Sequence, residues 1–272
     1  EPAGRVERNL SAAGFLVVSH AQIHRLQPDV PLIVPEVNIQ DLNLLQKQSG
    51  SSEGRLISCS NCMVLPIAIT LSPLIEIAGI KSVRIATQQA LSGGGRLLLA
   101  KGRAGHNISP EIPGEAESII TELEKILSSD FKIEASCERV VRDHGHYARI
   151  EVEFHDSVSA HQVVRAWREI HSRSQELNLP SAAKKPIVFV DGELDESHRW
   201  VGFEEIENPA LDLKAGMAVA VGEVEIEGTS LRFSLMADNT IRGAAGYSVL
   251  LVEQLLADGL LHDNNTILAQ EI

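Results

Sequence analysis

The stretch LISCSNCMVLP, residues 56–66, joins an apolar strand-like run to an apolar helix-like run through the short polar turn Ser60-Asn61. A side chain at such a junction lies at the carboxyl end of a strand, which is where open α/β sheets bind their ligands. It also lies at a helix N-terminus, where free N–H groups and the macrodipole bind anions and lower the pKa of a thiol. The pattern therefore makes Cys62 a candidate nucleophile; the alternative is a small buried cysteine that fills a helix–sheet contact.

Composition narrows the class of protein. The chain has 272 residues, with 24 basic and 37 acidic side chains and a formal net charge of −13. This charge disfavours nucleic acid or an anionic membrane surface as the partner. Three cysteines argue against a disulfide framework, and no apolar run reaches the length of a membrane span. We therefore expect a cytoplasmic protein, in a reducing compartment, with no nucleic-acid or membrane partner; the charge still permits a small anionic substrate, which needs only a local basic pocket.

In the first part of the chain, strand-like and helix-like segments alternate. Alternation of this kind favours a mostly parallel sheet. We expect strands at residues 15–19, 55–58 and 82–87, and the first of them reads as buried. Residues 30–37 contain two prolines and read as an edge segment or loop. We expect helices at residues 38–48, capped by Asn38, and at residues 63–77.

Further along the chain the expected strands follow one another, which suggests a second, more antiparallel α+β domain. Residues 132–141 and 147–154 read as two strands around a turn, and Arg139 and His146 would face each other across such a hairpin. The other expected strands are 188–190, 218–226 and 231–236, and the other expected helices are 115–127, 158–177 and 244–261.

Few polar groups are candidates for chemistry. Histidine is the usual acid or base near neutral pH and arginine the usual fork for a carboxylate, so Arg139 and His146 are candidates for a functional pair. The alternative is a surface hairpin with ordinary polar residues. Glu122 and Lys125, three residues apart on a helix, read as a solvated ion pair.

A metal site and a dinucleotide fingerprint are both poorly supported. The three cysteines, with His144 and His146, could bind zinc, but they lack the two tight ligand pairs of structural zinc sites, so we expect no metal. The glycines at 93–95 allow close backbone approach to a ligand or simply form a flexible turn. They are not part of a strand-GxGxxG-helix arrangement.

Six segments, in order along nearly the whole chain, together resemble one enzyme family. The chain is similar to aspartate-semialdehyde dehydrogenase, most closely to the archaeal and fungal type. The segments are DVPLIVPEVN (29–38), SNC (60–62), ATQQALSGGG (86–95), GEAESIITELEKIL (114–127), RVVRDHGH (139–146) and DNTIRGAAG (238–246).

The resemblance implies an α/β protein with a partial Rossmann-type nucleotide-binding domain and an α+β catalytic and dimerisation domain with a mixed sheet. Residues 1–61 would be the remaining part of the NADP-binding domain, 62–238 the catalytic domain, and 239–272 a C-terminal helix that returns to the first domain. The opening residues carry no Met and the family's glycine-rich phosphate loop does not occur, so we expect further sequence upstream. A homodimer or homotetramer is implied.

The implied activity is the NADPH-dependent reductive dephosphorylation of L-aspartyl 4-phosphate to L-aspartate 4-semialdehyde, in lysine, threonine and methionine biosynthesis. Cys62 would form a thioester, His146 would be the general acid/base and Gln89 would orient the substrate. The alternatives are a malonyl- or succinyl-CoA reductase of the same fold and a non-catalytic truncated paralogue.

The resemblance also assigns binding residues. Arg139 would hold the substrate carboxylate and Glu115 its ammonium, Arg25 and Asn61 the phosphate, and Ser92, Gly93 and Asn239 the NADP cofactor. The chain departs from the family pattern at three places. Cys59-Ser60 replaces Asn-Pro, Met63 replaces a hydroxyl residue, and Ser118 replaces a lysine, which removes a cation from the phosphate pocket.

Overall fold

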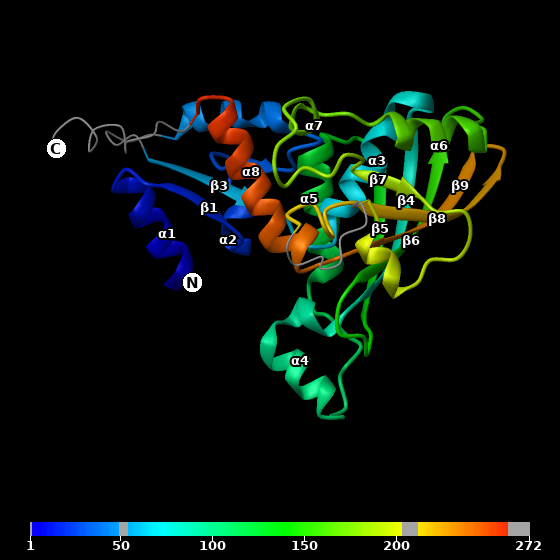
Figure 1. The fold of residues 1–272 in the computed structure, drawn as a ribbon, viewed down its shortest axis with the longest axis horizontal. Helices are drawn as coiled ribbons and strands as arrows, with labels where there is room; N and C mark the ends of the chain where they lie inside the picture. Colours follow the sequence, from blue (N-terminus) through cyan, green and yellow to red (C-terminus); the bar gives the residue numbers. More distant parts are fainter. Residues whose placement is uncertain (1, 49–53, 203–211, 261–272) are drawn as a thin grey trace.

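The computed structural model describes residues 2–48, 54–202 and 212–260, which form a small and a large β-sheet (Figure 1). The strands are β1 (Leu16–Ser19), β2 (Leu32–Ile33) and β3 (Arg55–Cys59) in the small sheet, and β4 (Ile80–Gln89), β5 (Lys132–Arg139), β6 (His146–Phe154), β7 (Ile187–Phe189), β8 (Val219–Glu227) and β9 (Ser230–Ala237) in the large one. The small sheet is parallel, in the order β1-β3-β2. The large sheet is mixed, in the order β5-β4-β6-β9-β8-β7, with only the β4–β5 and β7–β8 pairs parallel.

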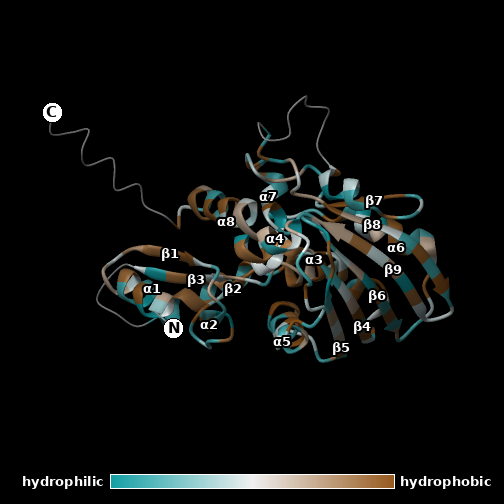
Figure 2. Ribbon diagram, turned by 90° about the horizontal axis from the view of Figure 1, so that it is seen from below, coloured by the Kyte–Doolittle hydropathy of each residue, from teal (hydrophilic) through white to brown (hydrophobic). Residues whose placement is uncertain are grey.

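The helices of the described ranges connect or flank these strands. They are α1 (Pro2–Ala12), α2 (Gln22–Arg25), α3 (Val64–Ala78), α4 (Arg96–Arg103), α5 (Glu115–Leu127), α6 (Ala160–Glu169), α7 (Arg173–Glu176) and α8 (Gly246–Ala257). Shorter turns are the 3₁₀ segments η1 (Ile39–Lys47), η2 (Leu91–Gly94) and η3 (Glu196–Trp200) and the π-helical turn η5 (Ile241–Ala245). The two sheets lie at opposite ends of the molecule with α3 and α5 between them, and α4 projects from the body (Figures 1 and 2).

Helix α3 is the centre of the core. Its sequence is apolar on nearly every side, and Leu65, Ile67 and Ile69 are fully buried, as expected of a helix enclosed by other elements. It contacts α5, α6, β8 and β9, and the indole N–H of Trp167 on α6 donates to the carbonyl of Thr70 at 2.9 Å. The position of α3 fixes the residues just before its first turn, which include Cys62.

The strands of the large sheet alternate between a buried and an outer face. In β4, Val83, Ile85 and Thr87 are buried, whereas Arg84 is exposed, as the two-residue period of a strand requires. Arg84 forms exposed ion pairs across the strands with glutamates of β5 and β6.

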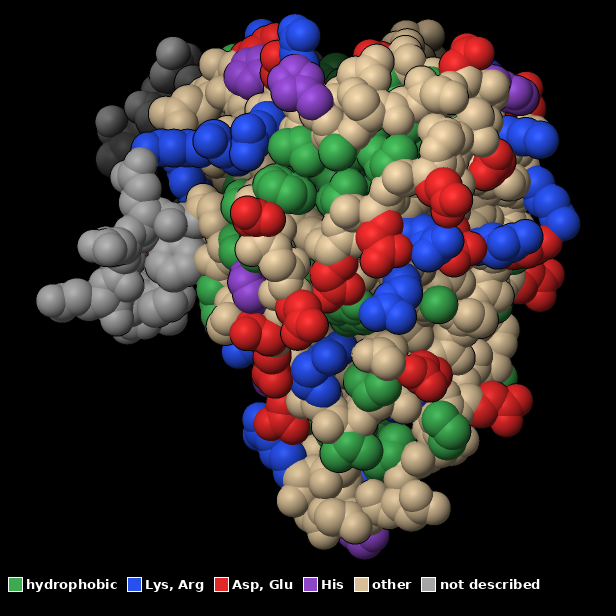
Figure 3. Space-filling model, turned by 90° about the vertical axis from the view of Figure 1, so that its right-hand side faces the viewer, with side chains coloured by type: hydrophobic (Ala, Val, Ile, Leu, Met, Phe, Trp, Pro, Cys, Tyr) green, Lys and Arg blue, Asp and Glu red, His purple; other side chains and the backbone are tan. Residues whose placement is uncertain are grey.

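On the molecular face seen in Figure 3, cationic and anionic side chains lie interleaved rather than separated by sign. No helix of the described ranges is long and apolar enough to cross a bilayer.

Most of the expected elements are confirmed, but one pairing is wrong. Residues 132–141 and 147–154 do form strands, β5 and β6, yet they are not a hairpin, because β4 lies between them and pairs with both. The segment between β5 and β6 instead crosses the end of β4, where the N–H of Val140 donates to the carbonyl of Gln89 at 3.0 Å.

Other expectations need correction in detail. Residues 158–177 form two helices rather than one, because Ser172 begins α7 with its own capping box. Residues 39–47 form a 3₁₀ segment, and the side chain of Asn38 binds Val34 N–H and Leu32 carbonyl instead of capping it. The first strand is mostly half-buried, because β1 lies at a sheet edge. The last helix spans Gly246–Ala257, and residue 261 lies outside the described residues.

Candidate active site

Four strands of the large sheet have a terminus at the same end of the sheet. Strands β4, β5 and β9 finish at this end and β6 starts there, because β6 runs antiparallel to both β4 and β9. The register therefore pairs Gln89 with Arg139 and His146 with Ala237. Cys62 reaches the same end of the large sheet from the small sheet, between the end of β3 and the start of α3. The predicted nucleophile and its predicted partners thus come together from both sheets.

Cys62 and His146 are in direct contact. The sulfur lies 3.2 Å from Nε2, and the other ring nitrogen, Nδ1, accepts the backbone N–H of Ala90 at 3.1 Å. A backbone N–H can only donate, so the neutral ring carries its proton on Nε2, facing the sulfur. Burial lowers the pKa of His146 to about 3, and the cations of Arg139 and Arg142 contribute in the same direction. The ring is therefore neutral around pH 7.

The electrostatics of Cys62 differ from the expectation. Cys62 as a residue is half-buried, and burial of its thiol raises the pKa to about 12; the carboxylate of Glu115 adds to this shift. Arg25 and Arg139 act in the opposite direction and do not overcome it. The expectation that the helix N-terminus lowers the pKa of this thiol is therefore wrong for the protein without a ligand, because burial of the thiolate costs more than the local cations recover.

Two glycines allow the close approach of the reactive groups. A Cβ at Gly93 would lie 2.8 Å from Nη1 of Arg139 and 2.9 Å from Nε2 of His146. A Cβ at Gly243 would lie 2.7 Å from the Cβ of Cys62. Both positions leave no room for a side chain, so their glycines are required by packing rather than by backbone conformation. Gly243 lies in the segment 238–246 noted in the sequence, but no individual role was predicted for it.

Arg139 and Ala90 hold the rim of the site. Nη1 of Arg139 donates to the carbonyl of Ala90 at 2.8 Å, while the backbone N–H of Ala90 donates to Nδ1 of His146. The side chains of Arg139 and His146 therefore both bind the backbone of Ala90, although they do not face each other across a hairpin. The role of the Ala90 backbone has no signal in the sequence, because any residue type except proline supplies the same two groups.

Glu115 is fixed by two side-chain amides. Its Oε1 accepts from Nδ2 of Asn61 at 3.0 Å and from Nε2 of Gln89 at 2.6 Å. The backbone N–H of Met63 donates to Oδ1 of the same asparagine at 2.7 Å, so the turn before α3 and the start of α5 are tied together. Glu115, Asn61 and Gln89 were each predicted as site residues, and the structure places them in one network.

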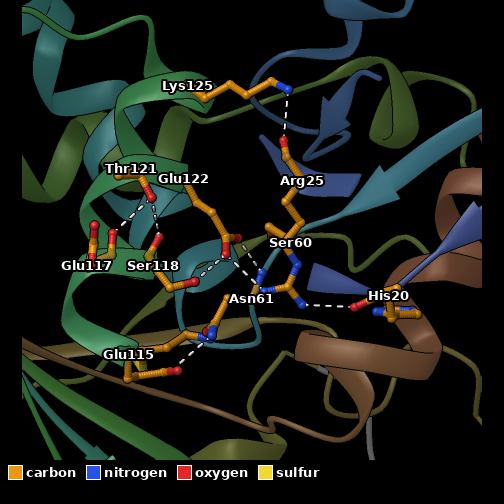
Figure 4. Close-up of polar contacts among 12 residues, drawn as sticks. His20, Arg25, Ser60, Asn61, Glu115, Glu117, Ser118, Thr121, Glu122 and Lys125 are labelled. Carbon is orange, nitrogen blue, oxygen red and sulfur yellow. Dashed lines mark hydrogen bonds and ion pairs between the residues drawn. The ribbon is translucent and has the colours of Figure 1, made fainter. Parts of the chain in front are cut away.

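Glu122 lies in a second network beside the first (Figure 4). Its Oε1 accepts from Nη1 of Arg25 at 2.9 Å and from the hydroxyl of Ser118 at 2.7 Å, and its Oε2 accepts from the backbone N–H of Asn61 at 2.7 Å. Arg25 also donates through Nη2 to the carbonyl of His20 at 3.0 Å. The prediction of a solvated ion pair for Glu122 is wrong, because this carboxylate is 2% exposed.

Lys125 also has a different role from the one predicted. Its Nζ donates to the carbonyls of Arg25, Gln27 and Val30 at 2.8–2.9 Å. It therefore does not pair with Glu122 as expected, and it fastens α5 to the segment that carries Arg25. The i, i+3 spacing of Glu122 and Lys125 shows that their side chains could form an ion pair. It does not show that backbone carbonyls from a distant segment bind the lysine instead.

The predicted cofactor residues also lie together. Nδ2 of Asn239 donates to the hydroxyl of Ser92 at 2.9 Å, and Oδ1 of Asn239 accepts the backbone N–H of Gly145 at 2.9 Å. Gly93 follows Ser92 and faces His146. The three residues therefore border the Cys62–His146 pair on the side of the large sheet.

Known proteins of similar sequence identify the family. The chain is 32% identical over 273 residues to the aspartate-semialdehyde dehydrogenase of Archaeoglobus fulgidus, with 95% of this chain and 75% of that protein covered. The chain belongs to the aspartate-semialdehyde dehydrogenase family. A malonyl CoA reductase (NADP) of Metallosphaera sedula is 30% identical over 95% of this chain and 74% of that protein. No family model matches the chain.

A solved structure agrees. An aspartate-semialdehyde dehydrogenase with NADP from Candida albicans is 28% identical, with a TM-score of 0.76 over 95% of this chain and 76% of that one. This likeness confirms the expected α/β fold, with a Rossmann-type part and a catalytic part that holds the mixed sheet. Membership of the aspartate-semialdehyde dehydrogenase family also confirms the resemblance seen in the six sequence segments.

One further pair had no interpretation at the sequence level. Arg242 in the π-helical turn of this dehydrogenase-family chain forms an ion pair with Glu36 at 2.6 Å, and both side chains are almost fully buried. Next to it, the hydroxyl of Tyr247 donates to the carbonyl of Ile33, and the N–H of Ser60 donates to that hydroxyl at 3.3 Å. The C-terminal segment thus supports the small sheet and the turn before Cys62.

The zinc alternative finds no support in the described ranges. Among those residues, no group of three or more His, Cys, Asp or Glu side chains is placed to hold a metal ion. His146 uses both ring nitrogens for Cys62 and Ala90, as set out above.

Proposed function

We propose that this protein is an NADP-dependent aspartate-semialdehyde dehydrogenase that reduces L-aspartyl 4-phosphate to L-aspartate 4-semialdehyde. The observation that carries the proposal is the 3.2 Å contact of Cys62 Sγ with His146 Nε2, beside a cation, Arg139, and a carboxylate, Glu115. A substrate with both a carboxylate and an ammonium group needs opposite charges at a fixed spacing, and this site supplies them.

In the proposed reaction, the sulfur of Cys62 bonds to the acyl carbon while the bond from that carbon to the phosphate oxygen breaks. The thiol proton leaves with the phosphate, so a thioester and inorganic phosphate are formed. When bound, NADPH would supply the hydride that reduces this thioester and would leave as NADP⁺. Collapse of the resulting thiohemiacetal anion then breaks the carbon–sulfur bond, releases the aldehyde and leaves the thiolate of Cys62, which takes up a proton from water.

His146 supports the sulfur through its Nε2–H. That proton faces Sγ in the free protein, so it can stabilise a thiolate by a hydrogen bond. To act as a base, the ring would have to take a proton on Nδ1 and give up the Ala90 contact, which costs a buried hydrogen bond. We therefore assign His146 first to the stabilisation of the thiolate and second to proton transfer.

Substrate binding follows from the remaining groups. Arg139 would use the rest of its guanidinium for the α-carboxylate, and Glu115 would accept the ammonium, for which Asn61 and Gln89 hold it in place. Arg25, with Asn61, would meet the phosphate. This proposal retains all the substrate residues predicted from the sequence.

The described residues fit the reacting end of a nicotinamide cofactor. Asn239 and Ser92 present amide and hydroxyl groups beside the Cys62–His146 pair, and Gly93, without a Cβ, keeps its backbone close to the ring of His146. We propose that these residues hold the nicotinamide. We further propose the domain boundaries at residues 61 and 238, a homo-oligomer built on the second domain, a cytoplasmic location and a role in lysine, threonine and methionine biosynthesis.

A malonyl- or succinyl-CoA reductase is the alternative. The similarity to a malonyl CoA reductase and the pairing of Arg25 with Glu122 favour it, because that pairing occupies a phosphate-binding cation. The presence of Glu115 favours the aspartyl substrate, because an acyl group without an ammonium leaves the charge of this carboxylate without a cation, although two amides still bind it.

One assay separates these activities. Full-length protein is mixed with NADPH and either L-aspartyl 4-phosphate, malonyl-CoA or succinyl-CoA, and NADPH absorbance is followed, with Cys62→Ala as the control. We expect oxidation with the acyl phosphate only, and none in the variant. Turnover with a CoA thioester alone would establish the alternative, and turnover by Cys62→Ala would exclude the thioester route.

A further inference from the structure

Three hydrogen-bond donors from three parts of the chain converge on one buried carboxylate. A guanidinium N–H of Arg25, the hydroxyl of Ser118 and the backbone N–H of Asn61 all donate to Glu122, at 2.9, 2.7 and 2.7 Å (Figure 4). An arginine fork, a hydroxyl and a backbone N–H beside a helix start are the donors that proteins use to bind phosphate. Glu122 therefore occupies an anion-binding arrangement built from the chain's own groups.

This arrangement has no excess positive charge among the residues that form it. Glu122 balances Arg25, whose second terminal nitrogen is bound to the carbonyl of His20 at 3.0 Å. Nζ of the neighbouring cation, Lys125, is bound to three carbonyls. A phosphate that approaches the site meets a cation that is already paired, next to a carboxylate that repels it.

We propose that Glu122 is an internal competitor of the substrate's phosphate group, and that it sets how tightly the site holds phosphate. In the free protein it keeps Arg25 and the N–H of Asn61 in place as an anion of its own. Phosphate binds by taking these donors from the carboxylate. The proposal rests on the proposed function for the identity of the anion, and it adds a residue that determines affinity.

A purely structural role for the pair makes the opposite prediction. If Glu122 only orients Arg25, loss of its charge should weaken phosphate binding, because the guanidinium loses its support. If Glu122 competes with phosphate, loss of its charge should strengthen binding, by about tenfold or more for a charge removed at contact distance. The sign of the effect therefore separates the two roles.

The test compares Glu122→Gln with Glu117→Gln, an exposed glutamate on the same helix. Inorganic phosphate alone is titrated into each protein, without NADPH or acyl substrate. Its dissociation constant is measured from protection of Cys62 against iodoacetamide and from the rise in melting temperature. We expect at least a severalfold tighter constant for Glu122→Gln, no change for Glu117→Gln, and loss of the effect when Arg25→Gln is added.

Unchanged or weaker phosphate binding in Glu122→Gln overturns the proposal. If this variant does not fold, Glu122→Asp provides a second test, because the shorter side chain draws the carboxylate back from Arg25 and from the N–H of Asn61 without leaving a buried cation unpaired. That variant should also bind phosphate more tightly, and failure to do so overturns the proposal. Because these titrations need no turnover, their outcome is independent of the NADPH assay, which alone decides the proposed function.

Discussion

Cys62 Sγ and His146 Nε2 lie 3.2 Å apart although 84 residues separate them in the chain. The cysteine comes from the end of the small sheet and the histidine from the first residue of a strand in the large one. Their contact therefore exists only while the segment that follows the small sheet is held against the large sheet. The reactivity of the thiol reports on this packing as well as on local chemistry.

The raised pKa of Cys62 gives a first prediction. With a pKa of about 12, the thiolate fraction rises about tenfold with each pH unit between pH 7 and pH 10, so the rate of alkylation should rise in the same way. Mass spectrometry of the Cys62 peptide after timed iodoacetamide treatment measures this rate. A plateau near neutral pH would mean that the thiolate is already formed in the free protein.

The second prediction concerns His146. His146→Asn should lower kcat by roughly a hundredfold with little change in KM, because the short amide cannot contact both Cys62 and Ala90. Steady-state kinetics of the full-length enzyme provide the measurement, and circular dichroism checks the fold. A large rise in KM at unchanged kcat would show that His146 binds substrate instead.

Arg139 gives a matched contrast. Arg139→Leu should chiefly raise KM for the acyl substrate, by about tenfold or more, since a charge-assisted pair with the carboxylate is lost. Arg139→Lys, which keeps the charge but not the fork, should have an intermediate KM. If both variants lose kcat and keep KM, the assignment of Arg139 to the substrate carboxylate is wrong.

Gly93 tests the spacing of the site. Gly93→Ala should lower kcat/KM by about tenfold or more, because the new methyl group would displace Arg139 or His146 from positions less than 3 Å away. Circular dichroism checks the fold, since the methyl group also crowds the buried ring of His146. Arg96→Ala, exposed on the following helix, is the control and should retain wild-type activity.

The last prediction is a pH dependence of stability. His146 has a folded-state pKa of about 3 against a usual value of 6.5, so below pH 6.5 the unfolded chain binds a proton that the folded ring does not. Stability from this residue is therefore complete above pH 6.5 and decreases as the pH falls toward 3. Urea titrations of the protein and of His146→Gln should show a steeper loss in the wild type, and equal slopes would contradict the assignment.

Local patterns in the sequence were enough to locate the strand–turn–helix junction that carries Cys62, the proposed nucleophile. The strand, turn and helix around Cys62 follow from apolar runs of different period and length, which neighbouring residues determine. Helix α5 was likewise predicted to the residue, because its apolar side chains repeat with the helical period.

Long-range pairing was not predictable in the same way. Residues 132–141 and 147–154 looked like a hairpin because they are close in sequence, but β4, from some fifty residues earlier, pairs with both. The partners of Glu122 come from residues 25, 61 and 118, and no local pattern indicates their convergence. Secondary-structure propensity and hydrophobic periodicity predict the conformation of a single segment. Which strand or side chain it pairs with depends on the packing of the whole protein.

The contacts of the C-terminal segment also bear on the order in which the protein is made. Arg242 binds Glu36 across 206 positions of the chain, and Tyr247 binds Ile33 across 214. While the ribosome is still synthesising the large sheet, the buried carboxylate of Glu36 has no cation and the small sheet lacks its last support. These contacts of the small sheet can therefore form only after residues 242–247 have emerged, and its folding should be slow for a reason of topology.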